Sequence, residues 1–126
     1  MPATEHAVEL AAAAARAAAE KKAENAVAID VSERLAFTDI FLIVSAANDR
    51  QVRAVVDAVE EAMFKAGAKA RVREGLEEAN WVLLDYADVV VHVLRDEDRE
   101  YYGLERLWKD CPMVPLPAVE PEPAQG

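Results

Sequence analysis

The sequence predicts an α/β domain in which a mixed five-stranded sheet packs against helices. Apolar residues recur at helical spacing over residues 52–63, which predicts an amphipathic helix. The uninterrupted apolar run at residues 40–44 is typical of a strand in the interior of a sheet. Apolar runs at residues 80–86 and 89–94 are separated by a short gap, which predicts an antiparallel hairpin. The full order of elements, α-β-β-α-β-β-β-α, favours layers of helix on sheet.

Length, charge and cysteine content narrow the class of protein further. A chain of 126 residues suffices for one domain with a modest core. Its formal net charge of −10 disfavours contact with nucleic acid, whose phosphates are bound by Lys and Arg, and favours a basic protein partner. The single cysteine, Cys111, excludes an intrachain disulfide, and no apolar run approaches the roughly 20 residues of a membrane span. We therefore expect a cytoplasmic protein with little direct nucleic-acid contact and no membrane contact.

The first part of the chain is expected to supply one helix and two strands. Residues 4–22 are rich in alanine, which has the highest helix propensity, and they predict a helix with a shallow apolar stripe. The predicted stripe consists of Val8, Ala11, Ala12, Ala15 and Ala19. Residues 26–31 predict a short strand, and residues 38–46 predict a second strand that is buried on both faces.

The amphipathic helix has clear start and stop signals. Asn48 can cap its first turn, and Gln51 can reach back toward the helix start. The helix is expected to run to Lys65, where Gly67 offers a left-handed stop. Residues 68–73 then predict a short polar-alternating strand that leads toward the hairpin.

The C-terminal part is expected to hold a short acidic helix and a tail. Residues 96–108 predict this helix, either continuous or interrupted and restarted. On a continuous helix, Tyr101, Leu104 and Trp108 share one face, and packing accounts for them. The aromatic residues of this segment exceed what so small a core needs, so a role in an interface stays open. We assign residues 1–112, including the alanine-rich helix, to one domain and residues 113–126 to a flexible proline-rich tail.

The hairpin contains the residues of greatest functional interest. Alternation places Trp81 and Asp85 on one face of the first strand and Tyr86 on the other. Trp81 is either a core residue or a half-exposed anchor for a partner, because Trp and Tyr dominate the energetics of many interfaces. Asp85 and Asp88 flank the turn, where aspartate is favoured because it bonds nearby backbone groups. The alternative interpretation, a metal or acid–base pair, would need a further ligand such as Asp39 or His92, which are the nearest candidates.

Collinear motifs between about residues 26 and 112 resemble those of the ribosomal silencing factor family, also called the Iojap family. They are Thr38–Ile43 followed by Ser45, Asn48–Val52, Gly75, Trp81–Tyr86, Asp88–His92, and Tyr102 with Leu104–Trp108. Together and in this order they are highly specific. One departure is Ala87, which stands where the family often has glycine. If this turn position requires a positive φ, alanine costs about 1 kcal/mol there.

The resemblance implies both a fold and a role. Family members have a fold similar to nucleotidyltransferases and are often homodimers when free. They bind a large-subunit ribosomal protein, L fourteen, on the face that joins the small subunit, and so they repress translation when nutrients are scarce. Nucleotidyl transfer is not carried over, because the chain has no Gly-Ser motif accompanied by paired metal-binding aspartates.

We therefore expect a protein-binding surface and no enzyme activity, catalytic residue, cofactor or metal. Its predicted members are Trp81, Asp85, Tyr86, Asp88, Tyr102 and Glu105. Aromatic side chains would supply buried area, and carboxylates would pair with Lys or Arg of the partner. Two alternatives remain. One is a degenerate nucleotidyltransferase-like enzyme that binds a divalent ion or nucleotide through Asp39, Asp85 and Asp88, and the other is a dimeric adaptor for a different basic partner.

Overall fold

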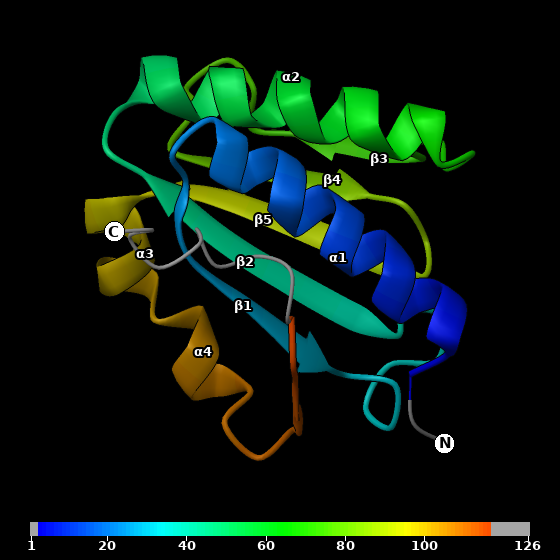
Figure 1. The fold of residues 1–126 in the computed structure, drawn as a ribbon. Helices are drawn as coiled ribbons and strands as arrows, with labels where there is room; N and C mark the ends of the chain where they lie inside the picture. Colours follow the sequence, from blue (N-terminus) through cyan, green and yellow to red (C-terminus); the bar gives the residue numbers. More distant parts are fainter. Residues whose placement is uncertain (1–2, 117–126) are drawn as a thin grey trace, which may run out of the picture.

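The computed structural model describes residues 3–116, which form the elements labelled in Figure 1. In chain order these are α1 (Glu5–Glu20), β1 (Glu24–Asp30), β2 (Ile40–Ala46), α2 (Asp49–Lys65), β3 (Val72–Glu74), β4 (Trp81–Asp85), β5 (Val89–Arg95), α3 (Asp96–Tyr102), α4 (Leu104–Leu107) and β6 (Met113–Val114). The predicted α/β class and the order of the elements through α3 are confirmed. Within residues 3–116, no helix is both long and apolar enough to cross a membrane.

The strands form one mixed sheet in the order β3-β4-β5-β2-β1-β6. β2 and β5 are parallel neighbours at the centre, and the other pairs are antiparallel. The sheet has six strands rather than the predicted five, because Met113 and Val114 pair with β1. Two residues are too few to show a strand period in the sequence. The tail predicted for residues 113–126 therefore begins within the sheet, and its residues 117–126 lie outside the described part of the chain.

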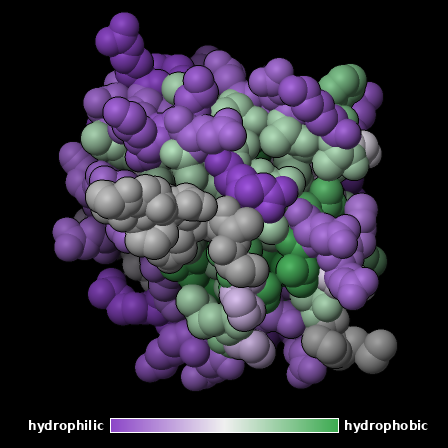
Figure 2. Space-filling model, in the orientation of Figure 1, coloured by the Kyte–Doolittle hydropathy of each residue, from purple (hydrophilic) through white to green (hydrophobic). Residues whose placement is uncertain are grey.

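The two faces of the sheet are covered differently. α1 and α2 lie side by side over one face, whereas α3 and α4 lie near one end of the sheet (Figure 1). Buried residues on the α1–α2 side form the larger core cluster. The smaller cluster lies on the opposite side and consists of Ile29, Val31, Ile43, Leu94 and Leu104. Figure 2 looks onto the α1–α2 side, which is mostly hydrophilic, with hydrophobic residues visible chiefly below α1. The opposite face has the smaller helical cover, because α3 and α4 have 7 and 4 residues whereas α1 and α2 have 16 and 17.

The central strand and the second helix follow their sequence patterns closely. Ile40, Leu42 and Val44 of β2 are 0% exposed on the α1–α2 side, and Ile43 is 0% exposed on the other. Burying each such side chain contributes about 1.5–3 kcal/mol. Asn48 accepts from the Gln51 N–H at 2.9 Å and so caps α2 as predicted.

The alanine-rich helix packs through a different face from the predicted one. Its buried residues are Ala7, Leu10, Ala11, Ala14, Ala15, Ala17 and Ala18, so Val8, Ala12 and Ala19 are only partly covered. A nearly uniform alanine sequence does not specify a face, and tertiary anchors select it instead. At its start, the Asp30 carboxylate accepts from the Ala3 N–H at 2.9 Å, and the Asp39 carboxylate accepts from the Thr4 N–H at 3.0 Å.

The chain from β3 to β5 shows one shifted strand and one strained turn. β3 occupies Val72–Glu74 rather than the predicted residues 68–73, because these are the residues that lie opposite β4. The hairpin between β4 and β5 is antiparallel as predicted. In its turn Ala87 has φ of 72°, a left-handed conformation that L residues with a Cβ rarely adopt.

Replacing Ala87 with glycine should raise the free energy of unfolding by about 1 kcal/mol, because glycine adopts a positive φ without a Cβ clash. Urea unfolding measures this change. The same replacement at Ala58, which lies within α2, is the matched control and should lower the free energy of unfolding by about 1 kcal/mol. A lower stability for Ala87→Gly would contradict the proposed strain.

Candidate functional site

A row of aromatic rings crosses the sheet face that α1 and α2 leave uncovered. In spatial order the members of this aromatic row are Tyr101, Tyr102, Trp81, His92, Phe41 and Trp108. Successive ring centroids are 5.0, 4.9, 6.1, 4.8 and 5.0 Å apart. The rings meet edge-on or tilted, which are the arrangements that aromatic pairs prefer. At one end the Arg34 guanidinium lies 5.6 Å from the Trp108 ring centroid.

The rings of the aromatic row come together through the register of β4 and β5 and through the position of α3 directly after β5. Trp81 of β4 and His92 of β5 point to the same face because Trp81 pairs with Leu94 and Leu83 pairs with His92. α3 follows β5 directly and brings Tyr101 and Tyr102 alongside.

The helical segment is not continuous, because Gly103 has φ of 57° and ends α3. The prediction that packing accounts for Tyr101 is therefore wrong. Tyr101 is 79% exposed, whereas Trp108 packs against the smaller core cluster.

The exposure of the rings differs strongly along the aromatic row. Tyr102 is 47% exposed, Trp81 is half-buried, and His92 is 4% exposed. The Trp81 indole N–H donates to Nδ1 of His92 at 3.1 Å. The aromatic row therefore has an accessible end at α3, and the polar ring of His92, further along the row, is buried.

His92 is held in its neutral form. Burial lowers the pKa of its imidazole from 6.5 to about 4. Because Nδ1 accepts a hydrogen bond in the neutral ring, the proton resides on Nε2. Nε2 is buried and has no hydrogen-bond partner among the described residues. A buried donor without a partner costs about 1–3 kcal/mol.

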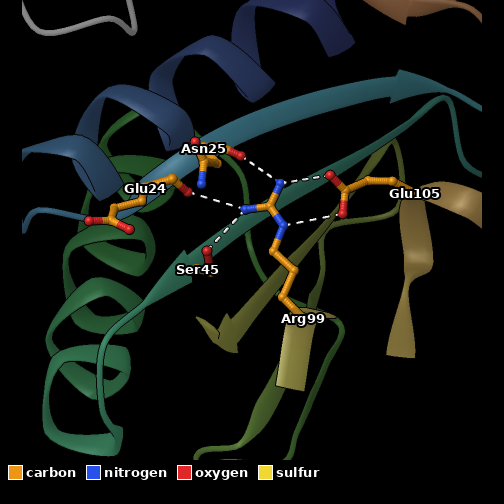
Figure 3. Close-up of polar contacts among 5 residues, drawn as sticks. All are labelled: Glu24, Asn25, Ser45, Arg99 and Glu105. Carbon is orange, nitrogen blue, oxygen red and sulfur yellow. Dashed lines mark hydrogen bonds and ion pairs between the residues drawn. The ribbon is translucent and has the colours of Figure 1, made fainter. Parts of the chain in front are cut away.

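Arg99 of α3 holds the helical segment onto the sheet (Figure 3). Its guanidinium donates to the backbone carbonyls of Glu24 at 3.2 Å and Asn25 at 2.6 Å, at an irregularity in β1, and to the Ser45 hydroxyl of β2 at 3.1 Å. Two further bonds, of 3.2 and 3.0 Å, reach both carboxylate oxygens of Glu105. Such a bidentate, charge-assisted pair is strong. Glu105 therefore already pairs with Arg99 within the chain, instead of offering a free carboxylate to a partner as predicted.

Tyr86 does not lie on the aromatic row. Its side chain is 6% exposed and belongs to the core cluster on the α1–α2 side. Burial, followed by the negative charge of Glu60, raises the pKa of its phenol to about 12. The expectation that Tyr86 forms one surface with Trp81 is thus corrected. The alternation that paired Tyr86 with the buried Val82 and Leu84 contained the signal.

The two hairpin aspartates lie apart from the aromatic row. Asp85 is four residues from Trp81 on the same strand, which is roughly 13 Å of extended chain. Its carboxylate accepts from the Ala87 N–H at 2.8 Å and pairs with Arg71 at 3.5 Å, which is the turn role predicted for it. Asp88 is exposed. Of the six predicted site residues, the structure therefore brings Trp81 and Tyr102 into contact and keeps Asp85 and Asp88 at the hairpin turn.

The aspartates required by the enzyme alternative have structural partners. Asp39 accepts from the Thr4 N–H at the start of α1, and Asp85 accepts within the hairpin turn. Among residues 3–116, no three His, Cys, Asp or Glu side chains lie where they could share a metal ion. Asp39 and Asp88 are neighbours, because the Asp39 N–H donates to the Asp88 carbonyl at 2.9 Å, but within the described residues these two and Asp85 do not form a set that could hold a metal ion.

The fold and the aromatic row define a small mixed α/β protein that presents aromatic side chains on one face of its sheet. The family profile described as "Ribosomal silencing factor during starvation" matches residues 4–126. This chain belongs to the ribosomal silencing factor family, as its motifs indicated.

Relatives and solved structures agree with this assignment. The ribosomal silencing factor RsfS of Bacillus subtilis is 40% identical over 103 residues, covering 82% of this chain and 87% of the relative. The chloroplastic protein Iojap of Zea mays is 33% identical over 106 residues, covering 82% of this chain and 45% of the maize protein.

Two solved structures share the fold. A crystal structure from Bacillus halodurans has a TM-score of 0.75 at 39% identity, covering 86% of this chain and 98% of its own. A structure from Chromobacterium violaceum has a TM-score of 0.77 at 32% identity, with 80% and 84% covered.

Replacing Glu105 with alanine should lower the free energy of unfolding, because Arg99 then loses its carboxylate. We expect a decrease of about 1–2 kcal/mol, less than for a fully buried pair because the Glu105 side chain is 40% exposed. Glu100→Ala, at an exposed position of the preceding helix α3, is the matched control and should change stability by less than about 0.5 kcal/mol. Equal stabilities for the two variants in urea would contradict the structural role of Glu105.

The buried imidazole of His92 should make stability depend on pH. Its pKa is about 4 in the folded state and 6.5 in the unfolded state. The unfolded state therefore binds the proton first as pH falls below 6.5, and the free energy of unfolding falls between pH 6.5 and 4 by up to about 3 kcal/mol. Urea unfolding at pH 7 and pH 4.5 should show this loss in the wild type and a smaller one in His92→Phe. An identical loss in both proteins would rule out His92 as its source.

Proposed function

We propose that this protein binds the large ribosomal subunit through its ribosomal protein L fourteen and thereby blocks joining of the small subunit, repressing translation when nutrients are scarce. The observation that carries the proposal is the partly exposed aromatic row on the sheet face opposite α1 and α2, in a member of the ribosomal silencing factor family. We also propose that the protein acts in the cytoplasm and is a homodimer when free.

The exposed end of the aromatic row has the composition of an interface centre. Tyr101 and Tyr102 are 79% and 47% exposed. Trp and Tyr are enriched among the residues that dominate binding energy, because they bury large area at low entropic cost. Trp81 and Tyr102 therefore remain in the proposed docking surface, whereas Tyr86 is buried on the opposite side of the sheet and Glu105 pairs with Arg99.

Carboxylates beside the aromatic row suit a basic partner. Glu97 and Glu100 of α3 are exposed next to the two tyrosines. Asp88 is also exposed, but at the hairpin turn, apart from the aromatic row. Charges at the rim of an interface chiefly steer encounter and exclude wrong partners. The chain's net charge of −10 acts in the same direction toward a basic ribosomal protein.

The proposed mechanism is steric. A protein seated on the joining face of the large subunit occupies volume that the small subunit needs, so no bond is made or broken. Such a mechanism requires a rigid, correctly shaped surface, and the packed ring contacts with the Arg99 anchor supply rigidity. Inhibition then depends on occupancy, and thus on affinity and concentration.

The double variant Trp81→Ala, Tyr102→Ala should bind purified large subunits about thirty-fold or more weakly than the wild type, because it removes two aromatic contacts. Sedimentation of large and small subunits with increasing protein measures both binding and subunit joining. Phe64→Ala is the matched control, since Phe64 is equally aromatic and 79% exposed but lies on α2.

Two results would contradict the proposal. Unimpaired subunit joining at saturating wild-type protein would overturn the function itself. Full affinity of the folded double variant, with circular dichroism like that of the wild type, would show that the aromatic row is not the docking surface.

A further inference from the structure

We propose that His92 is a positioning residue that orients the indole of Trp81 for docking and does not itself touch the partner. This inference rests on the proposed docking role of the aromatic row. It assigns a purpose to the buried imidazole, which lies under the proposed surface but contributes almost no exposed area to it.

The geometry fixes the indole from two directions. Its N–H donates to Nδ1 of His92 at 3.1 Å, and its ring meets Tyr102 at a centroid distance of 4.9 Å and an interplanar angle of 47°. His92 is itself held on its other side by the Phe41 ring at 4.8 Å. A half-buried tryptophan restrained in this way loses little side-chain freedom when a partner covers it, so docking carries a smaller entropic penalty.

The same hydrogen bond defines the chemistry that the partner must offer. A tryptophan N–H buried in an interface normally needs an acceptor, but here the acceptor lies within the chain. The partner group over Trp81 therefore need not be a carbonyl or carboxylate. An apolar side chain, or the cationic end of Lys or Arg stacked on the ring face, satisfies the site, which agrees with a basic protein partner.

Stability alone does not explain a histidine at this position. Its register neighbours on the same face are Leu83 and Ile43, so an apolar side chain would fit the surroundings. The imidazole instead leaves Nε2 buried without a partner among the described residues. Phenylalanine would keep a ring and remove that unpaired donor. The acceptor at Nδ1 is what phenylalanine cannot supply, and that acceptor acts on Trp81.

The test compares His92→Phe, which keeps a ring, with His92→Asn, whose side-chain oxygen lies near the position of Nδ1. We expect His92→Phe to be about as stable as the wild type at pH 7, because it removes the unpaired Nε2–H but takes the acceptor from the Trp81 N–H. It should nevertheless bind large subunits about three- to ten-fold more weakly. His92→Asn should restore affinity. The indole N–H resonance of Trp81, assigned with the help of Trp108→Phe, should move upfield in His92→Phe and stay near its wild-type position in His92→Asn. His92→Leu provides the same comparison if His92→Phe does not fold.

The outcomes separate this inference from the proposed function. If Trp81→Ala weakens binding but His92→Phe binds like the wild type, the positioning role is overturned and the docking surface stands. If Trp81→Ala leaves affinity unchanged, both are overturned. The positioning role is also overturned if the His92 variants lose affinity only in proportion to their loss of stability and the indole resonance of Trp81 does not change. His92 would then serve only the packing of the core.

Discussion

The guanidinium of Arg99 connects α3 to β1, β2 and the carboxylate at the start of α4, and the arrangement of the second sheet face depends on these bonds. Glu24, one of its backbone partners, lies 75 residues away along the chain. Both ends of the aromatic row come from the segment that Arg99 anchors, because Tyr101 lies in α3 and Trp108 follows α4. α4 has only four residues and does not persist alone. A buried Arg99 with every donor group engaged thus converts a weak helical segment into a fixed frame for the rings.

The parts of the fold that depend on local periodicity could be predicted from the sequence. β2, α2 and the hairpin each have a complete pattern of apolar residues with recognisable boundaries, so their prediction required no tertiary information. β6 was missed because two residues define no period, and the face of α1 was misassigned because alanine is nearly the same on all sides. For the site, alternation grouped Tyr86 correctly with Val82 and Leu84 but did not say which face the helices cover. The contacts of Arg99 and the place of Phe41 in the row join distant segments, which no local pattern encodes.

Stability and binding place opposite demands on the second sheet face. A closed apolar face would favour folding, whereas a surface for a partner must keep large rings partly accessible to water. The aromatic row runs from the most accessible rings, Tyr101 and Tyr102, through Trp81 to the least accessible polar ring, His92. Trp81 lies between them. Its indole N–H is hydrogen-bonded to His92 and its side chain is half-buried, which is the arrangement expected of an interface anchor. This arrangement leaves Nε2 of His92 without a hydrogen-bond partner among the described residues, which lowers the free energy of unfolding. The two buried hydrophobic core clusters, one on each side of the sheet, offset that loss.

Two groups of carboxylates bear on the mechanism, those that bind other parts of the chain and those exposed on α3. Asp30 and Asp39 accept from backbone N–H groups at the start of α1, Asp85 accepts within the hairpin turn, and Glu105 pairs with Arg99. These four hold elements together. The exposed acids of α3 lie beside the aromatic row instead, at the rim where charge guides a basic partner. A reactive centre would need acids gathered in one cleft, with their oxygens directed at a substrate. Here the inward acids are bound to the chain itself and the outward acids of α3 face solvent, an arrangement that agrees with the proposed steric mechanism.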